Sequence, residues 1–392
     1  MKKYSQFIYK DWELDPSTKK LTLHYSLDDA FHFSETYEFN FNWIENYDPA
    51  LLDAAIQTLF LLAGVSYYKT YLPPEIVISK GSVDKESAQF YEKTFQNGLG
   101  EFFYKNQLDP HTQIHFPYGE SLKKIEDSSK NTGMLVAIGG GKDSLASIEL
   151  LRKSSDKIAT WSLGYRQALE PLTNVIGFPH FFVDRSIDQQ LLELNKKDAY
   201  NGHVPISAIF ASVGIIIAVL TGYQDVVVSN ENSASDPTLT YQGKPINHQY
   251  SKSFEFEKDF QSHLDHIGIK HIRYYSLLRP FTELYISELF SSFGFEKYKH
   301  VFSSCNKCLK ENRLAWCGSC AKCAFVFLIL TPFVKREDLE QLFGGKNLLL
   351  DSSLDEMYEN LLGIKGDKPL DCVGEVKESR AAMLLAQKIY PE

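Results

Sequence analysis

The segment from Met134 to Leu151 reads MLVAIGGGKDSLASIELL, and it determines how the rest of the chain is interpreted. Its first five residues, Met134 to Ile138, predict a short buried strand; three glycines then form a turn, and a helix is expected to begin at Lys142. Glycine lets the backbone approach a ligand closely, and the first N–H groups of a helix have no partner within it. Because the helix dipole makes this end positive, the segment predicts a site for an anion, most naturally a phosphate group.

Two common phosphate-binding motifs do not fit this turn. A Walker A loop needs a glycine where Val136 stands and a serine or threonine where Asp143 stands. A dinucleotide-binding fingerprint needs a glycine in place of Ser144. The turn Gly139-Gly140-Gly141-Lys142-Asp143-Ser144 instead resembles the PP-loop of the ATP pyrophosphatase superfamily, usually written S-G-G-x-D-S. Gly139 replaces the leading serine, so one hydroxyl ligand for pyrophosphate is lost.

The bulk composition is that of a folded protein with more than one domain. The 392 residues suffice for two or three domains, and 44% hydrophobic with 23% charged residues is ordinary for a globular chain. A formal charge of −9 argues against a protein that binds nucleic acid through bulk electrostatics. The N-terminus has no apolar signal segment, and the apolar runs 213–220 and 325–330 are too short to cross a bilayer. A cytoplasmic protein without membrane association is therefore expected.

Short apolar segments alternate with helical patterns from residue 134 onward. The expected strands are Met134–Ile138, Ala159–Leu163, His180–Val183, Val226–Ser229 and His271–Ser276. This alternation predicts an α/β fold whose parallel sheet is doubly wound, with helices on both faces.

The segments on either side of this core differ from it in pattern. Residues 1–48 alternate polar and apolar residues as a small antiparallel sheet does, and 51–68 and 87–96 predict helices, the second closed by Gly98-Leu99-Gly100. We therefore expect an N-terminal α+β domain in residues 1–125, an ATP-binding α/β domain in 126–300, and a cysteine-rich C-terminal region in 301–392 that forms a zinc-bound helical tail.

Polar residues directly follow three of the expected strands. Ser162 ends one strand, Asp184-Arg185 another, and the cluster 229–233 with Glu231 and Ser233 a third. Ligands of open α/β sheets bind at the carboxyl ends of the strands. These side chains are therefore expected to line one pocket with the glycine turn.

Two later segments also carry a high density of polar residues. His203 lies in the stretch 201–205 before a helix, and His248 and Lys252 lie in the stretch 247–257. In an ATP site, Lys252 is suited to pair with phosphate oxygens. A carboxylate such as Glu231, Glu255 or Glu257 is suited to hold Mg²⁺.

Five of the six cysteines lie between residues 305 and 323, which is the clustering of a metal site rather than of dispersed disulfides. Cys317, Cys320 and Cys323 have the spacing of tetrahedral zinc ligands, and either Cys305 or Cys308 supplies the fourth sulfur. A site closed by four thiolates has no open position, so a structural zinc ion is expected.

The PP-loop combined with these cysteines resembles cyano-deazaguanine synthase. The long N-terminal domain and the tail do not fit that compact enzyme and are more similar to the ATP-dependent UDP-N-acetylmuramoyl-L-alanyl-L-glutamate epimerase family. This resemblance spans residues 134–376, and the N-terminal part is only loosely similar. The segments that carry this resemblance are 139–144, Gly202-His203-Val204-Pro205, 229–234, Asn247-His248-Gln249, Ser251-Lys252-Ser253, Arg279-Pro280, Trp316-Cys317-Gly318 and 368–375. The resemblance implies an adenine nucleotide alpha hydrolase-like fold.

The resemblance also implies a reaction. ATP would adenylate the L-glutamate carboxylate of a UDP-linked peptide, the α-carbon would be inverted, and AMP and pyrophosphate would leave. Gly140, Gly141 and Ser144 would hold pyrophosphate, Asp143 would orient Mg²⁺, and Gly139 and Lys142 would also bind the nucleotide. Cys372, His203 and His248 are the candidates for the base and the acid.

Three alternatives stay open. The chain could be another carboxylate-adenylating synthase that forms a nitrile or an amide, a PP-loop enzyme that modifies tRNA, or a nucleotide-binding module without turnover. The acidic charge and the clustered cysteines speak against the tRNA enzyme, which would need a free catalytic cysteine and a basic groove.

Overall fold

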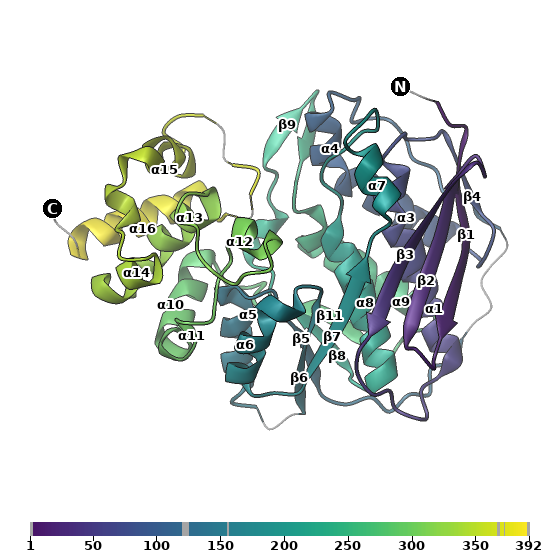
Figure 1. Ribbon diagram of the computed structural model, residues 1–392, viewed down its shortest axis with the longest axis horizontal. Helices are drawn as coiled ribbons and strands as arrows, with labels where there is room; N and C mark the ends of the chain where they lie inside the picture. The colour runs from purple at the N-terminus through teal and green to yellow at the C-terminus, as the bar shows by residue number, and fades with distance from the viewer. Residues whose placement is uncertain (1–2, 120–124, 155–156, 367–368, 372, 390–392) are drawn as a thin grey trace. The chain divides into compact units, whose positions relative to one another are not determined.

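A computed structural model describes residues 3–119, 125–154, 157–366, 369–371 and 373–389 of the chain (Figure 1). The chain divides into two compact units, each assembled from separated segments. The first unit comprises Met1–Leu135, Phe181–Val226 and Leu239–Tyr275, and the second comprises Val136–His180, Val227–Thr238 and Ser276–Glu392.

The fold is mixed α/β with a large, mostly parallel sheet, as the alternation of strands and helices predicted. Nine strands hydrogen-bond in the order β11-β8-β5-β6-β7-β3-β2-β1-β4. All five strands expected from residue 134 onward are confirmed, as β5 (Met134–Ala137), β6 (Ile158–Leu163), β7 (His180–Ser186), β8 (Asp225–Val228) and β11 (Arg273–Ser276). A separate two-stranded hairpin consists of β9 (Leu239–Tyr241) and β10 (Lys244–Ile246).

The antiparallel N-terminal strands are also confirmed. They are β1 (Gln6–Asp15), β2 (Lys20–Leu27) and β3 (Phe31–Phe39), paired in sequence order. The short strand β4 (Glu75–Ile78), which the alternation pattern did not indicate, pairs in parallel with β1. Four residues are too few to show a period, so only the pairing partner reveals this strand.

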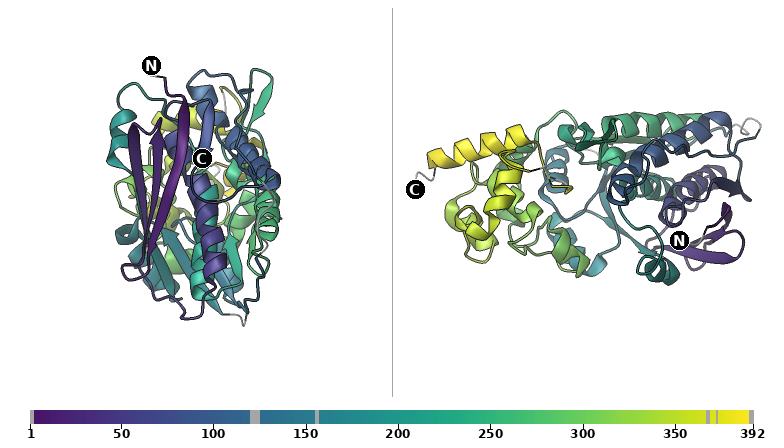
Figure 2. Two further views of the ribbon diagram at one scale, coloured as in Figure 1. Left: turned by 90° about the vertical axis from the view of Figure 1, so that its right-hand side faces the viewer. Right: turned by 90° about the horizontal axis from the view of Figure 1, so that it is seen from above.

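The helices of the first unit pack on these strands. The region 51–68, predicted to be helical, forms α1 (Pro49–Ala63) and α2 (Val65–Tyr68), and α1 lies along the β1–β3 strands (Figures 1 and 2). The hydroxyl of Tyr9 donates to the Leu61 carbonyl at 2.9 Å, and that of Tyr25 donates to the Phe60 carbonyl at 3.0 Å. The remaining α-helices are α3 (Lys85–Gly98), α4 (Gly100–Lys105), α7 (Gln189–Leu194), α8 (Ile206–Thr221) and α9 (Phe254–His266).

Gly98-Leu99-Gly100 was expected to close α3, and it does so while also starting α4. The stretch Pro49–Tyr68 is long and apolar enough to cross a membrane by length and composition alone. However, 78% of its most apolar window is buried inside the protein, as in the core helix of a globular fold.

The helices of the second unit surround its strands and form its C-terminal region. They are α5 (Lys142–Leu151), α6 (Arg166–Ile176), α10 (Glu283–Phe293), α11 (Phe295–Tyr298), α12 (Asn306–Lys310), α13 (Ala321–Leu330), α14 (Arg336–Leu342), α15 (Asp355–Leu361) and α16 (Val376–Ile389). Helix α10 packs against α5, and the apolar helix α13 packs against α10, α15 and α16 (Figure 1). The C-terminal region is therefore helical, as the sequence predicted.

A buried ion pair joins the antiparallel strands to β7. Strand β3 pairs antiparallel with β7, and Tyr37 stands opposite Arg185 in the register. The guanidinium of Arg185 donates to the carboxylate of Glu35 at 2.8 Å, and the Tyr37 hydroxyl donates to the same carboxylate. The side chains of Arg185 and Glu35 are 9% and 0% exposed, so neither charge has water as a substitute partner.

Replacing Arg185 by methionine should destabilise the fold by about 3–5 kcal/mol, because it leaves the Glu35 carboxylate buried without its partner. The measurement is the free energy of unfolding in urea. Adding Glu35→Leu to this variant should recover much of the loss, since the uncompensated charge is then removed as well.

The matched control is Lys10→Met, which breaks the exposed pair that Lys10 forms with Asp29 at 2.9 Å. This variant should unfold at the same urea concentration as the parent protein, because water and salt screen an exposed pair. Equal losses of unfolding free energy in Arg185→Met and Lys10→Met would show that the buried pair contributes no more than the exposed one.

Candidate active site

The glycine turn has the predicted strand–turn–helix geometry. Strand β5 ends at Ala137, and the Ile138 N–H donates to the Trp161 carbonyl of β6 at 2.9 Å. Gly141 is the N-cap residue of α5, with φ −86° and ψ 167°, and it has no side chain that could bind the first N–H groups. The Ser144 hydroxyl donates to the Gly141 carbonyl at 3.1 Å. The start of α5 therefore presents backbone N–H groups that can donate hydrogen bonds to an anion.

The glycines of the turn differ in what they contribute. Gly140 has φ +90°, and a Cβ atom there would lie 2.6 Å from Cδ1 of Leu314 and 3.2 Å from the Ser303 carbonyl oxygen. The Ser303 N–H donates to the Gly140 carbonyl at 2.9 Å. Gly139 is exposed, and a Cβ atom there would meet no heavy atom within 4 Å. Gly140 is thus required by the backbone, whereas Gly139 borders open space.

Lys142 was expected to bind the nucleotide, and the structure places its side chain between two carboxylates. Its Nζ atom lies 2.5 Å from Oδ1 of Asp143 and also contacts Oε2 of Glu283, while its side chain is 3% exposed. Burial alone would lower the pKa of Lys142, but the charges of Asp143 and Glu283 outweigh burial and raise it. Lys142 therefore stays charged and neutralises part of the acidic cluster beside the loop.

Glu231 lies in the same unit and adds to this acidic cluster. It is buried after β8, and its Oε2 atom accepts the Ala234 N–H at 2.8 Å. Burial first, and then the charge of Glu283, raises the pKa of Glu231 to about 7. The Ser229 and Ser147 hydroxyl oxygens are 2.8 Å apart, which ties the segment after β8 to α5.

Glu283 is a site residue that sequence reasoning missed. It follows the N-cap Thr282 and occupies the first turn of α10, where acidic residues are common because they complement the helix dipole. The sequence therefore offered only the signal of an ordinary helix start. Its side chain is 4% exposed and contacts Lys142, so it belongs to the acidic cluster beside the glycine turn.

Ser162 was expected to line the same pocket as the glycine turn, and its hydroxyl is bound by a half-buried histidine. The Ser162 Oγ atom lies 3.0 Å from Nε2 of His180, and Oγ1 of Thr160 lies 2.8 Å from Nδ1 of the same ring. Burial first, and then the charge of Arg166, lowers the pKa of His180 to about 3. The ring is therefore neutral and fixed by two hydroxyls.

His203, His248 and Lys252 come together in the first unit. Nδ1 of His203 lies 3.7 Å from Oε2 of Glu101. Burial first, and then the charges of His248 and Lys252, lowers the pKa of His203 to about 4. His203 is therefore neutral at physiological pH and able to accept a proton.

Several other predicted residues have structural partners or lie elsewhere. Asp184 accepts from the Asn40 amide at 2.7 Å, and Glu255 pairs with Lys93 at 2.8 Å. Arg185 belongs to the ion pair with Glu35 described above. Cys372 lies outside the described residues.

Four cysteines of the second unit form one compact cluster. The Sγ atoms of Cys305, Cys317, Cys320 and Cys323 all lie within 4.8 Å of one another. The sulfurs of Cys305 and Cys320 are 3.9 Å apart, those of Cys317 and Cys323 3.7 Å, and those of Cys320 and Cys323 3.5 Å. A tetrahedral ion with metal–sulfur bonds of about 2.3 Å would separate its ligands by about 3.8 Å. The cluster therefore fits a metal ion.

This cluster distinguishes between the two candidates for the fourth ligand. Cys305, the N-cap residue of α12, belongs to the four, whereas Cys308 is buried within α12 and does not. Spacing alone left the two equivalent, because both precede Cys317 by a loop long enough to return to it.

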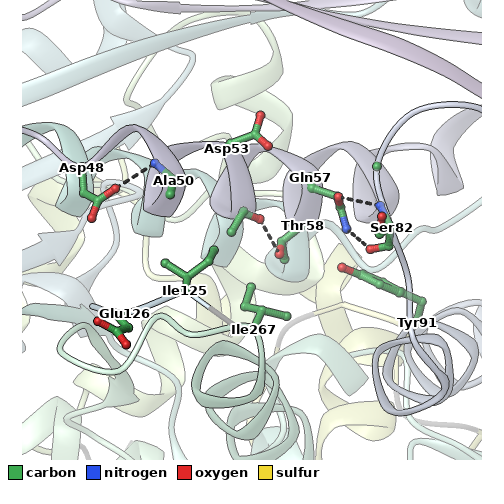
Figure 3. A pocket seen from close by; sticks show the side chains of 12 residues that line it. Asp48, Ala50, Asp53, Gln57, Thr58, Ser82, Tyr91, Ile125, Glu126 and Ile267 are labelled. Atoms are coloured by element: carbon green, nitrogen blue, oxygen red, sulfur yellow. Dashed lines mark hydrogen bonds between the residues drawn. The ribbon is translucent and has the colours of Figure 1, made fainter. Parts of the chain in front are cut away.

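Described residues line a cavity in each of the two units. One of about 350 Å³ in the second unit is lined by residues that include Phe302, Trp316 and Leu314, the residue that contacts Gly140. The other, of about 490 Å³ in the first unit, lies along α1 and contains none of the predicted site residues (Figure 3). Its described lining carries the carboxylates of Asp48, Asp53 and Glu126 and no cationic side chain, so it does not match an anionic nucleotide.

These features define the class of the molecule: an α/β protein with a glycine turn at the start of a helix, an acidic cluster beside it and four clustered cysteines that could hold a metal ion. Family models assign it more closely. The model of the MurL N-terminal domain matches residues 1–277, and that of the MurL C-terminal domain matches residues 301–390. The chain belongs to the MurL family.

Relatives of this chain carry one name, UDP-N-acetyl-alpha-D-muramoyl-L-alanyl-L-glutamate epimerase. The protein of Xanthomonas oryzae pv. oryzae is 38% identical over 97% of this chain and 85% of the relative. That of Salinispora tropica is 36% identical over 98% of this chain and 85% of the relative. That of a Micromonospora species is 38% identical over 86% of this chain and 76% of the relative.

The cysteine cluster predicts that Cys305, and not Cys308, is required for metal binding. Cys305→Ser should lose the metal and unfold at lower denaturant concentration, because one of the four ligands is removed. Cys308→Ser is the matched control, since it changes a buried cysteine of the same segment that lies outside the cluster. Elemental analysis of both purified proteins decides the matter, and loss of metal from the Cys308 variant alone would contradict the assignment.

Proposed function

We propose that the protein inverts the α-carbon of the terminal L-glutamate in UDP-N-acetylmuramoyl-L-alanyl-L-glutamate, with cleavage of ATP to AMP and pyrophosphate. The observation that carries the proposal is the identity of 36–38% to three epimerases over most of the chain. The product would be the D-glutamate peptide used in peptidoglycan synthesis.

We assign ATP to the glycine turn, read as a PP-loop. Three observations support this assignment: the open space beside Gly139, the uncapped start of α5, and the acidic cluster beside it. Mg²⁺ bound with the nucleotide would neutralise phosphate charge, and Asp143 and Glu231 are the carboxylates suited to hold it. Lys142 keeps Asp143 and Glu283 in place rather than contacting phosphate itself.

The chemistry explains why ATP is needed. Removing the α-proton beside a carboxylate anion would build a second negative charge on the same atoms. Attack of the carboxylate oxygen on the α-phosphorus, with pyrophosphate leaving, removes that charge and creates an electron sink. A base then takes the proton from one face, and an acid returns a proton to the other face. Hydrolysis of the adenylate releases AMP and the inverted product.

His203, His248 and Cys372 are the candidates for base and acid. Of these, His203 has the best support as the base, because it is held neutral and retains 30% side-chain exposure. Lys252, whose charge acts on the same ring, is suited to bind an anionic group of the substrate.

Four thiolates leave no open position on the metal, so we assign a structural zinc ion to Cys305, Cys317, Cys320 and Cys323. Reduced thiolates in such a cluster are typical of the cytoplasm, where we place the protein. We further propose the domain boundaries 1–125, 126–300 and 301–392, a small UDP-linked peptide as the only partner, and no nucleic-acid or membrane binding.

The nucleotide product tests the PP-loop assignment. With the UDP-linked peptide present, ³¹P NMR should show AMP and pyrophosphate, and Ser144→Ala should lower AMP formation about 100-fold, the loss typical of removing a transition-state donor. Ser147→Ala is the control, because Ser147 lies on the same helix and its hydroxyl pairs with Ser229 instead. ADP and phosphate as products would refute the assignment.

Inversion is tested in deuterated water. The peptide product should carry deuterium at the glutamate α-carbon, and only when ATP is present, because without adenylation the carboxylate has no electron sink. Mass spectrometry of the product measures this directly. AMP release with deuterium-free product would mean that the activated carboxylate passes to another nucleophile, as in an amide- or nitrile-forming synthase.

A further inference from the structure

A buried lysine of the first unit has no counter-charge among the described residues. Lys69 is the residue that ends α2, and it is 4% exposed. Its Nζ atom donates to Oδ1 of Asn201 at 3.2 Å and to Oδ1 of Asn195 at 3.4 Å. Both acceptors are neutral amide oxygens, and no described carboxylate pairs with it.

Such an arrangement is costly for the fold. An ammonium removed from water without an anion loses solvation that amide oxygens only partly replace. Burial accordingly lowers the pKa of Lys69 to about 8. Methionine would fill a similar volume without this cost, so the contribution of Lys69 lies in what it holds rather than in overall stability.

What Lys69 holds is a loop. Asn195 is the C-cap residue of α7, and Asn201 follows six residues later, so one ammonium binds both ends of the segment 195–201. The neighbouring residue Thr70 adds a backbone contact, since its carbonyl accepts the Tyr200 N–H at 2.9 Å. The end of α2 thus secures this loop at three points.

Helix α4 holds the same loop by other contacts. The Asn106 side-chain amide donates to the Asn201 carbonyl at 2.9 Å. The Asn201 side-chain oxygen also accepts the Gly202 N–H at 2.8 Å, which shapes the backbone just before His203. Glu101 lies in α4 five residues before Asn106, and its Oε2 atom is 3.7 Å from Nδ1 of His203. Lys69 and Asn106 therefore both fix Asn201, which lies two residues before His203, the candidate base.

We infer that Lys69 is a positioning residue, whose contacts with Asn195 and Asn201 fix the loop that aims the imidazole of His203 at the substrate α-carbon. The inference rests on the proposed function, in which His203 transfers a proton. It extends that function to a residue at the end of α2, whose described side-chain hydrogen bonds go to Asn195 and Asn201 rather than to the ring.

The test is Lys69→Met, with deuterium incorporation, AMP release and stability measured on the same protein. Deuterium incorporation should fall about 100-fold, the loss typical of misplacing a catalytic group by about 1 Å. AMP release should persist, because the loop that binds ATP is untouched. The free energy of unfolding should stay equal or rise, since a buried charge has been removed.

Two further variants make the test specific. Asn201→Ala should give at least the same loss, because it removes the contact with Lys69 and that with the Gly202 N–H. The two losses should be less than additive in the double variant, because the Lys69–Asn201 contact is common to both. Lys19→Met is the matched control. Lys19 also binds two neutral oxygens, those of Phe41 and Asn42, but it lies in the turn between β1 and β2. It should incorporate deuterium at the parental rate.

The failures can be told apart. A parent enzyme that incorporates no deuterium would defeat the proposed function itself. A parent that does so, with Lys69→Met incorporating deuterium equally fast, would overturn the positioning role alone. Unchanged incorporation in His203→Gln would also overturn it, because the loop would then have no catalytic ring to aim. Loss of folding in Lys69→Met, matched by Lys69→Leu, would assign the lysine to stability instead.

Discussion

The contact of one buried ammonium with two carboxylates determines the geometry around the glycine turn. Lys142 opens α5, and its charge holds Asp143 of the same helix beside Glu283 of α10. Without it, the buried carboxylate of Glu283, the half-buried carboxylate of Asp143 and the nearby Glu231 would repel one another. The glycine turn therefore does not stand alone: the acidic groups around it keep their positions because Lys142 neutralises them.

Lys69 and Lys142 show how differently the same side chain behaves in two buried settings. Lys142 has two carboxylate partners, and its pKa is raised above the ordinary value despite burial. Lys69 has amide partners only, and burial lowers its pKa to about 8. One lysine is fixed by charge in an acidic cluster, and the other fixes a loop at a cost in solvation. In this account, the first serves activation of the carboxylate and the second serves proton transfer.

The elements of the fold were predictable where the signal is local. Strands β5 to β8 and the helix after Gly141 follow from apolar periods and from glycine, which act within a few residues of the sequence. The choice of Cys305 over Cys308 and the roles of Glu283 and Lys69 were not predictable, because each depends on a partner far away in the chain. Strand β4 escaped for the same reason, since its four residues become a strand by pairing with β1.

The proposed reaction depends on the carboxylate of the substrate attacking the α-phosphorus of ATP, and oxygen labelling tests this step most directly. The UDP-linked peptide would be prepared with ¹⁸O in the glutamate α-carboxylate and turned over with unlabelled ATP in unlabelled water. Attack by that carboxylate followed by hydrolysis at the acyl carbon must leave one ¹⁸O atom in AMP, which mass spectrometry detects. Unlabelled AMP alongside inverted product would contradict an acyl adenylate that is hydrolysed at its acyl carbon, and with it the route by which the proposal releases AMP.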